Sequence, residues 1–212
     1  MSKLTEPNKN CSKCRRLYNF RKKNKSMNPD WFNAPVPTFG ELSSSLLIVG
    51  LAPGLQGANK TGRPFTGDYA GDLLYKTMNK FNFSKGKYAG TIDDSLKLKD
   101  CTITNAVRCV PPQNKPISEE INNCNNFLKK TIEFHKNLKV IIALGLIAHK
   151  SIISAFNLKQ KLYKFKHGNK HKIDNLILID SYHCSRYNTN TGRLNEEMFD
   201  KIFFEAKKEL KI

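Results

Sequence analysis

The sequence contains no long apolar run. No stretch approaches the roughly 20 consecutive apolar residues that a transmembrane helix requires. The segment Met1–Glu6 also lacks the apolar core of a secretory signal peptide. We therefore expect a cytoplasmic, intracellular protein that does not enter a membrane. In a reducing compartment, its six cysteines are expected to be metal ligands or buried thiols rather than disulfides.

Acidic residues are scarce relative to basic ones. The chain has 18 Asp and Glu against 36 Lys and Arg, which gives a formal net charge of +18 at pH 7. A field of this sign concentrates polyanions, and nucleic acid is the commonest polyanion that soluble proteins meet. The many Lys-Asn pairs leave a second interpretation open, in which the charge reflects a compositional bias and a solvated surface.

Internal repeats are absent, and 212 residues suffice for one α/β domain but not for two ordinary ones. Four short β-type runs occur at 45–49, 101–105, 139–144 and 175–180. Continuously apolar strands separated by helical patterns predict a mostly parallel sheet covered on both faces. We therefore predict a three-layer α/β/α fold with a four-stranded, mostly parallel sheet, in a single domain over residues 1–212.

Helical spacing of apolar residues predicts helices at 72–81 and 146–156, and two more that begin near Ser118 and Asn195. Ser118 and Asn195 each precede two glutamates, a pattern typical of a capped helix start with an acidic first turn. The Lys-rich segment 157–172 lies between the third and fourth strands and is expected to be a solvated loop or hairpin.

Four of the six cysteines have a spacing that metal sites use. Cys11 and Cys14 form a Cys-x-x-Cys pair in the polar segment 1–40, which has no sustained period and is predicted to be an arm or extended cap. Cys109 lies just beyond a predicted strand, and Cys124 falls in the next helix, so the four can converge on one metal centre. Zinc and a [4Fe–4S] cluster both satisfy such a site, and four unconnected small hydrophobic residues remain the alternative.

Two unusual loops follow predicted strands. Residues 50–54 (Gly-Leu-Ala-Pro-Gly) and 62–68 follow the first strand, and residues 183–193 follow the fourth. Open α/β sheets bind ligands at the carboxyl ends of their strands, so the two loops predict one pocket. Residues 54–61 also come within one residue of a phosphate-binding loop, which would indicate a nucleotide hydrolase. Irregular chain follows, however, where that loop requires a helix.

Five ordered motifs over nearly the whole chain resemble the uracil-DNA glycosylase superfamily, and within it the iron–sulfur family 5 (type B) enzymes. They are Cys11-x2-Cys14, Gly50–Gly54, Gly57–Asp68, Thr104–Pro116 with Cys124 after it, and His183–Leu194. The resemblance implies a four-stranded parallel sheet between helices. It also implies a [4Fe–4S] cluster on Cys11, Cys14, Cys109 and Cys124, and a monomer whose partner is DNA containing deaminated bases.

The resemblance also implies roles for pocket residues. Phe65 is expected to stack on a base flipped out of the DNA. Asn105 is expected to read O4 and N3–H of uracil, because an amide offers both a donor and an acceptor. His183 is expected to hydrogen-bond O2 of the departing base as negative charge develops on it. Ala52 and Gly54 are the other predicted base contacts.

The first motif lacks a carboxylate. Leu51 and Ala52 stand where relatives carry Glu or Asp, and neither can activate water. We therefore predict that leaving-group stabilisation carries catalysis, with Asn59 the candidate that orients the water and Asp68 the other pocket candidate. The missing carboxylate also extends the predicted substrates from uracil to hypoxanthine and xanthine.

Residues that follow His183 are the predicted DNA contacts: Arg186, Tyr187, Asn190 and Arg193. Tyr187 is the candidate that fills the stack vacated by the flipped base. No lysine nucleophile is evident in either loop, so the predicted enzyme is a monofunctional glycosylase. A non-catalytic DNA-binding module of the same fold is the alternative, favoured by Leu51 and Ala52, and the nucleotide hydrolase is the third hypothesis.

Overall fold

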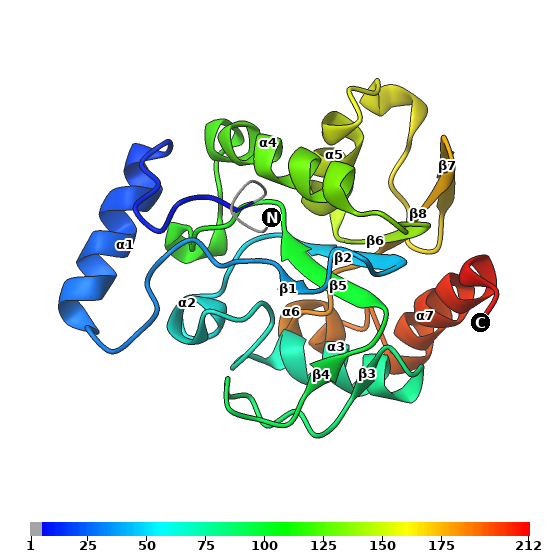
Figure 1. Ribbon diagram of the computed structural model, residues 1–212, viewed down its shortest axis with the longest axis horizontal. Helices are drawn as coiled ribbons and strands as arrows, with labels where there is room; N and C mark the ends of the chain where they lie inside the picture. The colour runs from blue at the N-terminus through cyan, green and yellow to red at the C-terminus, as the bar shows by residue number, and fades with distance from the viewer. Residues whose placement is uncertain (1–5) are drawn as a thin grey trace.

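The structure, a computed structural model, describes residues 6–212 (Figure 1). Residues 1–5 lie outside the described residues. They include part of the predicted arm and most of the Met1–Glu6 segment. At the centre is a parallel sheet in the order β5-β2-β6-β8. Its strands are β2 (Leu46–Gly50), β5 (Cys101–Asn105), β6 (Val140–Leu144) and β8 (Leu176–Ser181).

Antiparallel strands extend both edges of this sheet. β1 (Phe39–Gly40) pairs with β5, and β7 (Lys170–Ile173) pairs with β8, so the described chain has a six-stranded sheet. The expectation of a mostly parallel sheet is confirmed, and the predicted count of four strands is wrong. β1 is too short to carry a strand pattern, and β7 has the polar composition of an edge strand, so neither has an apolar run that a sequence reading detects.

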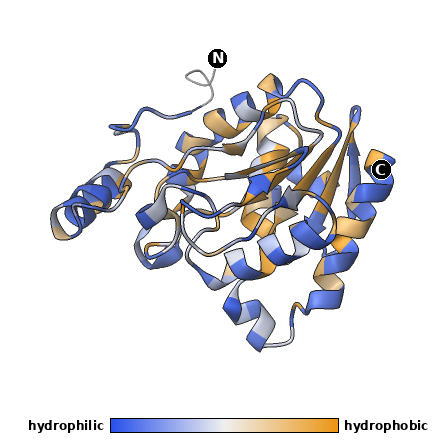
Figure 2. Cartoon of the chain, turned by 60° about the horizontal axis from the view of Figure 1, so that its bottom comes forward, coloured by the Kyte–Doolittle hydropathy of each residue, from blue (hydrophilic) through white to orange (hydrophobic). Residues whose placement is uncertain are grey.

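Helices cover both faces because alternate residues of the central strands point to opposite sides. Leu46 and Ile48 pack with α3 (Tyr69–Lys80) and α7 (Glu196–Leu210). Leu47 and Val49 pack with α4 (Ser118–Phe134) and α5 (Leu146–Ala155). Figure 2 shows the apolar strands in the middle of the molecule and hydrophilic residues on the outer parts of the helices. The shorter elements are α1 (Arg15–Met27), α2 (Ala58–Thr61), β3 (Ser84–Lys85), β4 (Lys97–Leu98), α6 (Arg186–Asn190) and the 3-10 turns Pro112–Asn114 and Gln160–Leu162.

The four predicted helices are present with adjusted ends. α3 starts three residues before the predicted Asp72, because Asp68 caps it by accepting a hydrogen bond from the Gly71 amide at 3.0 Å. Asn195 caps α7 as predicted, accepting from the Met198 amide at 2.8 Å. Ser118 is the first residue of α4 rather than its cap.

The predicted arm contains a helix that the sequence analysis missed. α1 runs for 13 residues, and its buried residues are Leu17, Arg21 and Asn24. Two of these three are polar, so the buried face carries no hydrophobic period. In Figure 1, α1 lies at one end of the molecule, beside the sheet rather than on it. None of the helices in residues 6–212 has the length and apolar character to cross a membrane.

Candidate active site

The carboxyl ends of the parallel strands bring the predicted pocket residues together. Gly50 ends β2 and pairs in register with Asn105, which ends β5. A Cβ atom on Gly50 would lie 2.4 Å from Asn105 Oδ1 and 2.6 Å from Phe65 Cζ. Only glycine therefore leaves room at this point for the amide and the ring to meet. His183 reaches the same place from the residues after β8.

Phe65 and His183 stack on each other. Their ring centroids are 5.9 Å apart and the planes are inclined by 26°. The backbone of Phe65 has φ of 53°, which non-glycine residues rarely adopt. Two tyrosine hydroxyls hold this conformation: Tyr75 donates to Pro64 O at 2.6 Å, and Tyr88 donates to Phe65 O at 3.2 Å. The aromatic ring is thus presented by a rigid loop.

A buried ion pair anchors that loop. The guanidinium of Arg63 binds both carboxylate oxygens of Asp94, at 2.8 and 2.7 Å, and its Nε donates to Thr66 Oγ1 at 2.8 Å. Both side chains are almost completely buried. Hydrogen bonding from Arg63 lowers the pKa of Asp94 to about 2. The loop around Phe65 is therefore tied to the segment that contains Asp94.

Asn105 and His183 present polar atoms without partners. Asn105 is only 3% exposed. Within residues 6–212, neither its side-chain amide nor the His183 imidazole makes a hydrogen bond. Burial lowers the pKa of His183 to about 4, so the imidazole is neutral at pH 7. The amide atoms of Asn105 are not among the fully buried polar atoms of the described chain, so a ligand with complementary groups can reach them.

The Asp68 carboxylate lies against the first motif, which has no carboxylate of its own. One of its oxygens caps α3, and the other, Oδ2, faces the glycines of the first loop. Cβ atoms built on Gly54 and Gly57 would lie 3.1 and 2.8 Å from Oδ2. Burial is the main cause of a raised pKa at Asp68. This carboxylate is separated from the first motif by more than ten residues of sequence, and only the folded loop brings the two together.

Asn59, the residue that the sequence analysis favoured for orienting water, is fully buried in α2. Its Nδ2 donates to Asn33 Oδ1 at 2.9 Å, and its own Oδ1 is buried without a partner in the described chain. The orientation of this amide is set by Asn33, whose Nδ2 donates to the carbonyl of Asn28 at 2.9 Å. One acceptor on Asn59 is therefore left over for a further donor.

The geometry does not fit a nucleotide hydrolase. α2 is a single turn that ends at Gly62, where φ is 80°. A phosphate-binding loop needs the amino terminus of a sustained helix to hold its anion. Here the Asp68 carboxylate instead faces Gly54 and Gly57, and its negative charge would repel a polyphosphate.

The other predicted contacts occupy different places. Ala52 packs toward the cysteine-lined pocket, in a cluster with Leu17 and Val107, so its contact with a base stays a prediction. Residues 183–193 were expected to form a loop, yet they contain α6, which is capped by Ser185. Tyr187 lies on this helix with 72% of its surface exposed.

One basic residue begins α6 and another follows it. The guanidinium of Arg186 lies 5.4 Å from the ring centre of Tyr69, and that of Arg193 lies 4.6 Å from the ring centre of Tyr182. Asn190, at the end of α6, is exposed. These side chains are therefore available at the surface beside the pocket residue His183.

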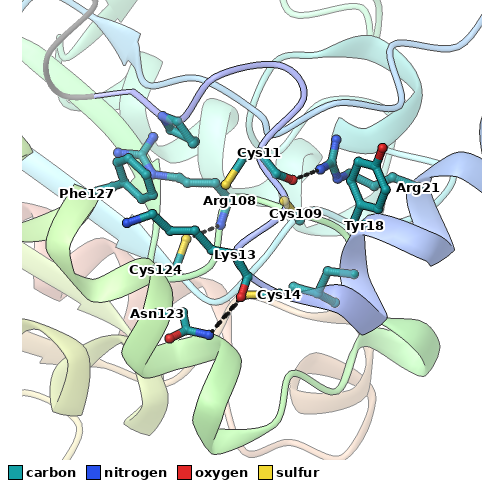
Figure 3. A pocket seen from close by; sticks show the side chains of 12 residues that line it. Cys11, Lys13, Cys14, Tyr18, Arg21, Arg108, Cys109, Asn123, Cys124 and Phe127 are labelled. Atoms are coloured by element: carbon teal, nitrogen blue, oxygen red, sulfur yellow. Dashed lines mark hydrogen bonds between the residues drawn. The ribbon is translucent and has the colours of Figure 1, made fainter.

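The four cysteines predicted to bind metal line one pocket (Figure 3). Two precede α1, one follows β5 and one lies in α4: Cys11, Cys14, Cys109 and Cys124. In the described chain, no three of these sulfur atoms lie within 4.8 Å of one another. A single tetrahedral zinc ion holds its sulfurs ~3.8 Å apart, so the pocket is wider than a zinc site.

The lining of this pocket fits an anionic, thiolate-bound group. Burial raises the pKa of Cys109 to about 12 and that of Cys124 to about 11, so these thiols need a bound cation to become ligands at neutral pH. The Arg108 amide donates to Cys124 Sγ at 3.3 Å. Arg21 and Arg108 also line the pocket, and the Nε of each is buried without a partner in the described chain.

Comparison with known proteins identifies the family of this site. A family model described as the uracil DNA glycosylase superfamily matches residues 37–207. The chain belongs to this superfamily. It is 38% identical over 204 residues to the Type-5 uracil-DNA glycosylase of Thermus thermophilus, covering 93% of each chain. It is 34% identical over 201 residues to the Type-5 enzyme of Pyrobaculum aerophilum, covering 93% of this chain and 88% of the relative.

A Type-4 uracil-DNA glycosylase of Pyrobaculum aerophilum is also similar, with 37% identity over 154 residues, 72% of this chain and 64% of the relative. The resemblance inferred from the motifs is thus confirmed at the level of the superfamily. For this superfamily member, Asn105, Phe65 and His183 converge as the motifs predicted. The hydroxyl contacts of Tyr75 and Tyr88 and the Arg63–Asp94 ion pair were missed, because their partners lie far apart in sequence.

Proposed function

We propose that this chain is a uracil-DNA glycosylase that hydrolyses the bond between uracil and deoxyribose in DNA, the first step of base excision repair. The observation that carries the proposal is the unpaired, nearly buried amide of Asn105 beside the stacked rings of Phe65 and His183. Membership of the superfamily and the names of the Type-5 relatives support it. The proposal treats the chain as one domain that acts as a monomer.

Base recognition follows from the donors and acceptors in this pocket. A uracil flipped out of the stack lies on the Phe65 ring, and Asn105 donates to O4 and accepts from N3–H. Cytosine presents an amino donor at C4 and an acceptor at N3, so the same amide orientation would meet donor with donor and acceptor with acceptor. Hypoxanthine and xanthine keep a carbonyl beside an N–H, so they are included as proposed substrates.

Cleavage separates charge between the base and the sugar. As the C1′–N1 bond breaks, the bonding electrons pass to uracil, and the neutral His183 imidazole donates a hydrogen bond to O2. The free Oδ2 of Asp68 faces the emerging sugar cation and accepts a proton from the water whose oxygen adds to C1′. The unpaired Oδ1 of Asn59 makes it the second candidate for holding that water. No covalent enzyme intermediate is required.

DNA binding uses the basic surface around the pocket. The net charge of +18 attracts the phosphate backbone. Arg186, Asn190 and Arg193 are proposed to contact phosphates, and the exposed ring of Tyr187 to fill the space left by the flipped base.

The cysteine pocket is proposed to hold a [4Fe–4S] cluster on Cys11, Cys14, Cys109 and Cys124. When bound, the cluster supplies a structural crosslink between the arm and the body of the protein. Cys109 lies four residues after Asn105 in the sequence, so fixing its sulfur also restrains the chain that leaves the recognition amide.

A product assay tests the proposal. Duplexes with uracil, hypoxanthine or xanthine at one position are incubated with excess protein and then cleaved with alkali at any abasic site formed. We expect strand breaks at uracil that are absent without alkali and absent from a cytosine control duplex. Asn105→Asp should retain DNA binding and lose uracil excision, since the carboxylate repels O4 and has no donor. Binding of uracil-containing DNA by the unaltered protein without excision would instead support the non-catalytic module.

A further inference from the structure

The Lys-rich segment 157–172 contacts the end of β8. The sequence predicted a solvated loop or hairpin there. The Asp180 amide donates to Asn169 O at 2.9 Å, and the Gly168 amide donates to Asp180 O at 2.8 Å. Two residues further on, the Tyr182 amide donates to His167 Nδ1 at 3.0 Å. The backbone that leads into the pocket histidine is therefore held from one side by residues 167–169.

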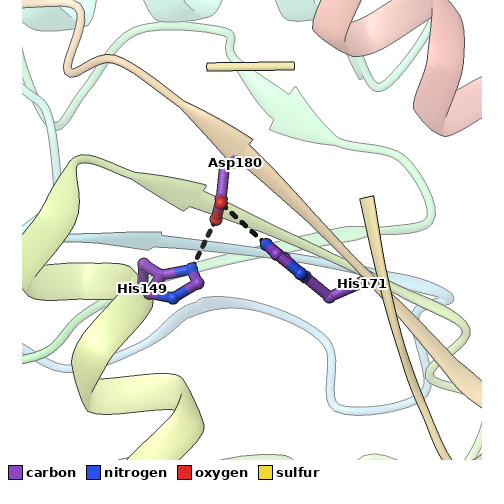
Figure 4. A group of neighbouring side chains, drawn as sticks. All are labelled: His149, His171 and Asp180. Atoms are coloured by element: carbon purple, nitrogen blue, oxygen red, sulfur yellow. Dashed lines mark hydrogen bonds and ion pairs between the residues drawn. The ribbon is translucent and has the colours of Figure 1, made fainter. Parts of the chain in front are cut away.

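At the centre of this contact is the buried carboxylate of Asp180 (Figure 4). Its Oδ1 lies 2.7 Å from Nδ1 of His149 on α5, and its Oδ2 lies 2.9 Å from Nε2 of His171 on β7. The Lys166 amide also donates to Oδ2, at 3.3 Å. Within residues 6–212, no Lys or Arg side chain pairs with Asp180, so the two imidazoles are its counter-groups.

Both ring nitrogens of His149 have an oxygen partner. Nε2 lies 2.9 Å from the backbone carbonyl of Tyr163, and a carbonyl oxygen only accepts hydrogen bonds. Nδ1 lies 2.7 Å from Asp180 Oδ1. The ring is therefore held at both nitrogens, and it joins α5 to the buried carboxylate on β8. Removing the carboxylate would leave a buried ring nitrogen without its partner, which is strongly unfavourable.

A metal ion is the other group that these three side chains could hold. One ligand atom from each of His149, His171 and Asp180 lies within 4.8 Å of the other two. The two imidazoles, however, contact different oxygens of Asp180 at hydrogen-bond distances of 2.7 and 2.9 Å. The arrangement therefore matches protons between the rings and the carboxylate better than a shared ion.

We propose that Asp180 is a positioning residue for His183, an inference that rests on the proposed function. The His183 imidazole makes no hydrogen bond within residues 6–212, so its place depends on the backbone on either side of it. Asn188 donates to His183 O at 2.8 Å on the downstream side. On the upstream side, Asp180 joins α5 and β7 to β8 and so fixes the direction in which the chain leaves the sheet.

The test combines kinetics with histidine NMR. Asp180→Asn keeps the side-chain shape and removes the charge. We expect its single-turnover rate of uracil excision to fall by about 10- to 100-fold, since displacement of a catalytic group by about 1 Å has an effect of this size. Its affinity for abasic-site DNA should stay within about twofold, and the His183 ring resonances should shift.

The matched control is Lys170→Ala, on the same strand as His171. Lys170 forms surface ion pairs with Glu205 and Glu209 on α7, at 2.6 and 2.8 Å, and does not touch Asp180. We expect this variant to excise uracil at the normal rate and to leave the His183 resonances unchanged. A loss equal to that of Asp180→Asn would mean that general weakening of β7, and not the carboxylate, moves the pocket.

Nitrogen-15 spectra of the unaltered protein give a readout that does not depend on the variant folding. The spectra should show hydrogen bonds between the Asp180 carboxylate and the rings of both His149 and His171, and the absence of either would overturn the proposal. A folded Asp180→Asn with a normal rate and unchanged His183 resonances would overturn it too. So would binding of one Zn²⁺ equivalent that this substitution abolishes. If the unaltered protein excises no uracil, the proposed function fails, while the His149 and His183 spectra still decide the positioning role.

Discussion

Removing the His183 imidazole should slow uracil excision without weakening DNA binding. In the proposed reaction, this ring donates a hydrogen bond that strengthens only as charge develops on the departing base. Loss of one such donor is worth about 2.7–4 kcal/mol, or roughly 100- to 1,000-fold in rate. Because the ring makes no hydrogen bond within residues 6–212, His183→Ala leaves no partner there unpaired, and its effect on folding is confined to the packing on Phe65.

The assay is single-turnover excision from a duplex with a U·G pair, together with the affinity for the same duplex containing an abasic site. His183→Gln is the matched variant, because its amide keeps an N–H donor and should recover part of the lost rate. A rate for His183→Ala within fivefold of the unaltered protein would refute the reasoning, since another group would then have to stabilise the leaving base.

The protonation state of His183 adds a pH test of the same idea. Burial lowers its pKa to about 4, so the ring stays neutral as the pH falls from 8 to 5. We expect no inflection in the excision rate near the ordinary histidine pKa of 6.5. A rise in rate as the pH falls through 6.5, absent from His183→Gln, would show that the cation is the active form.

Four further predictions concern the loops, the cysteines and the DNA surface. Asp68→Asn should lower the excision rate by about 100-fold or more. It should also remove the acid limb of the pH–rate profile, because burial raises the pKa of Asp68 above 3.8. An unchanged acid limb would assign it to another group. Asp94→Asn should destabilise the fold by about 3 kcal/mol and lower the Tm by about 6–12 °C. Because the Asp94 pKa is lowered from 3.8 to about 2, this stabilisation is present above pH 3.8 and is lost as the pH falls toward 2, so a Tm difference that persists at pH 2 would contradict it. Cys124→Ser should abolish the iron content and visible absorption of anaerobically prepared protein, whereas zinc without iron in the unaltered protein would exclude the cluster. Tyr187→Ala should slow excision from U·A pairs more than from U·G mismatches or single strands at an unchanged salt dependence, and equal losses on all three would remove Tyr187 from the wedge role.

Only the tertiary structure revealed the contacts between buried polar residues that are distant in sequence. The buried face of α1 contains Arg21, which donates to Lys9 O before the helix, and Asn24, which donates to Phe20 O within it. Burial there follows from these hydrogen bonds and not from an apolar stripe. The contact between residues 163–171 and Asp180 could not be predicted for the same reason. It is made by histidines and backbone amides rather than by apolar side chains. Hydrophobic periodicity records which positions avoid water, and it carries no signal for buried polar pairs.

The sequence by itself determined the parallel core and the set of residues that meet in the pocket. The four apolar runs each form a central strand, and parallel strands must bring their carboxyl ends to one edge of a sheet, so Gly50, Asn105 and His183 could be placed together before any coordinates. The cysteine spacing likewise predicted one shared pocket. Only the folded chain decided that Phe65 takes a left-handed conformation held by two tyrosines, and that the Asp68 carboxylate faces the first motif. Those arrangements depend on contacts between loops, whose paths are set by their partners because no local period constrains them.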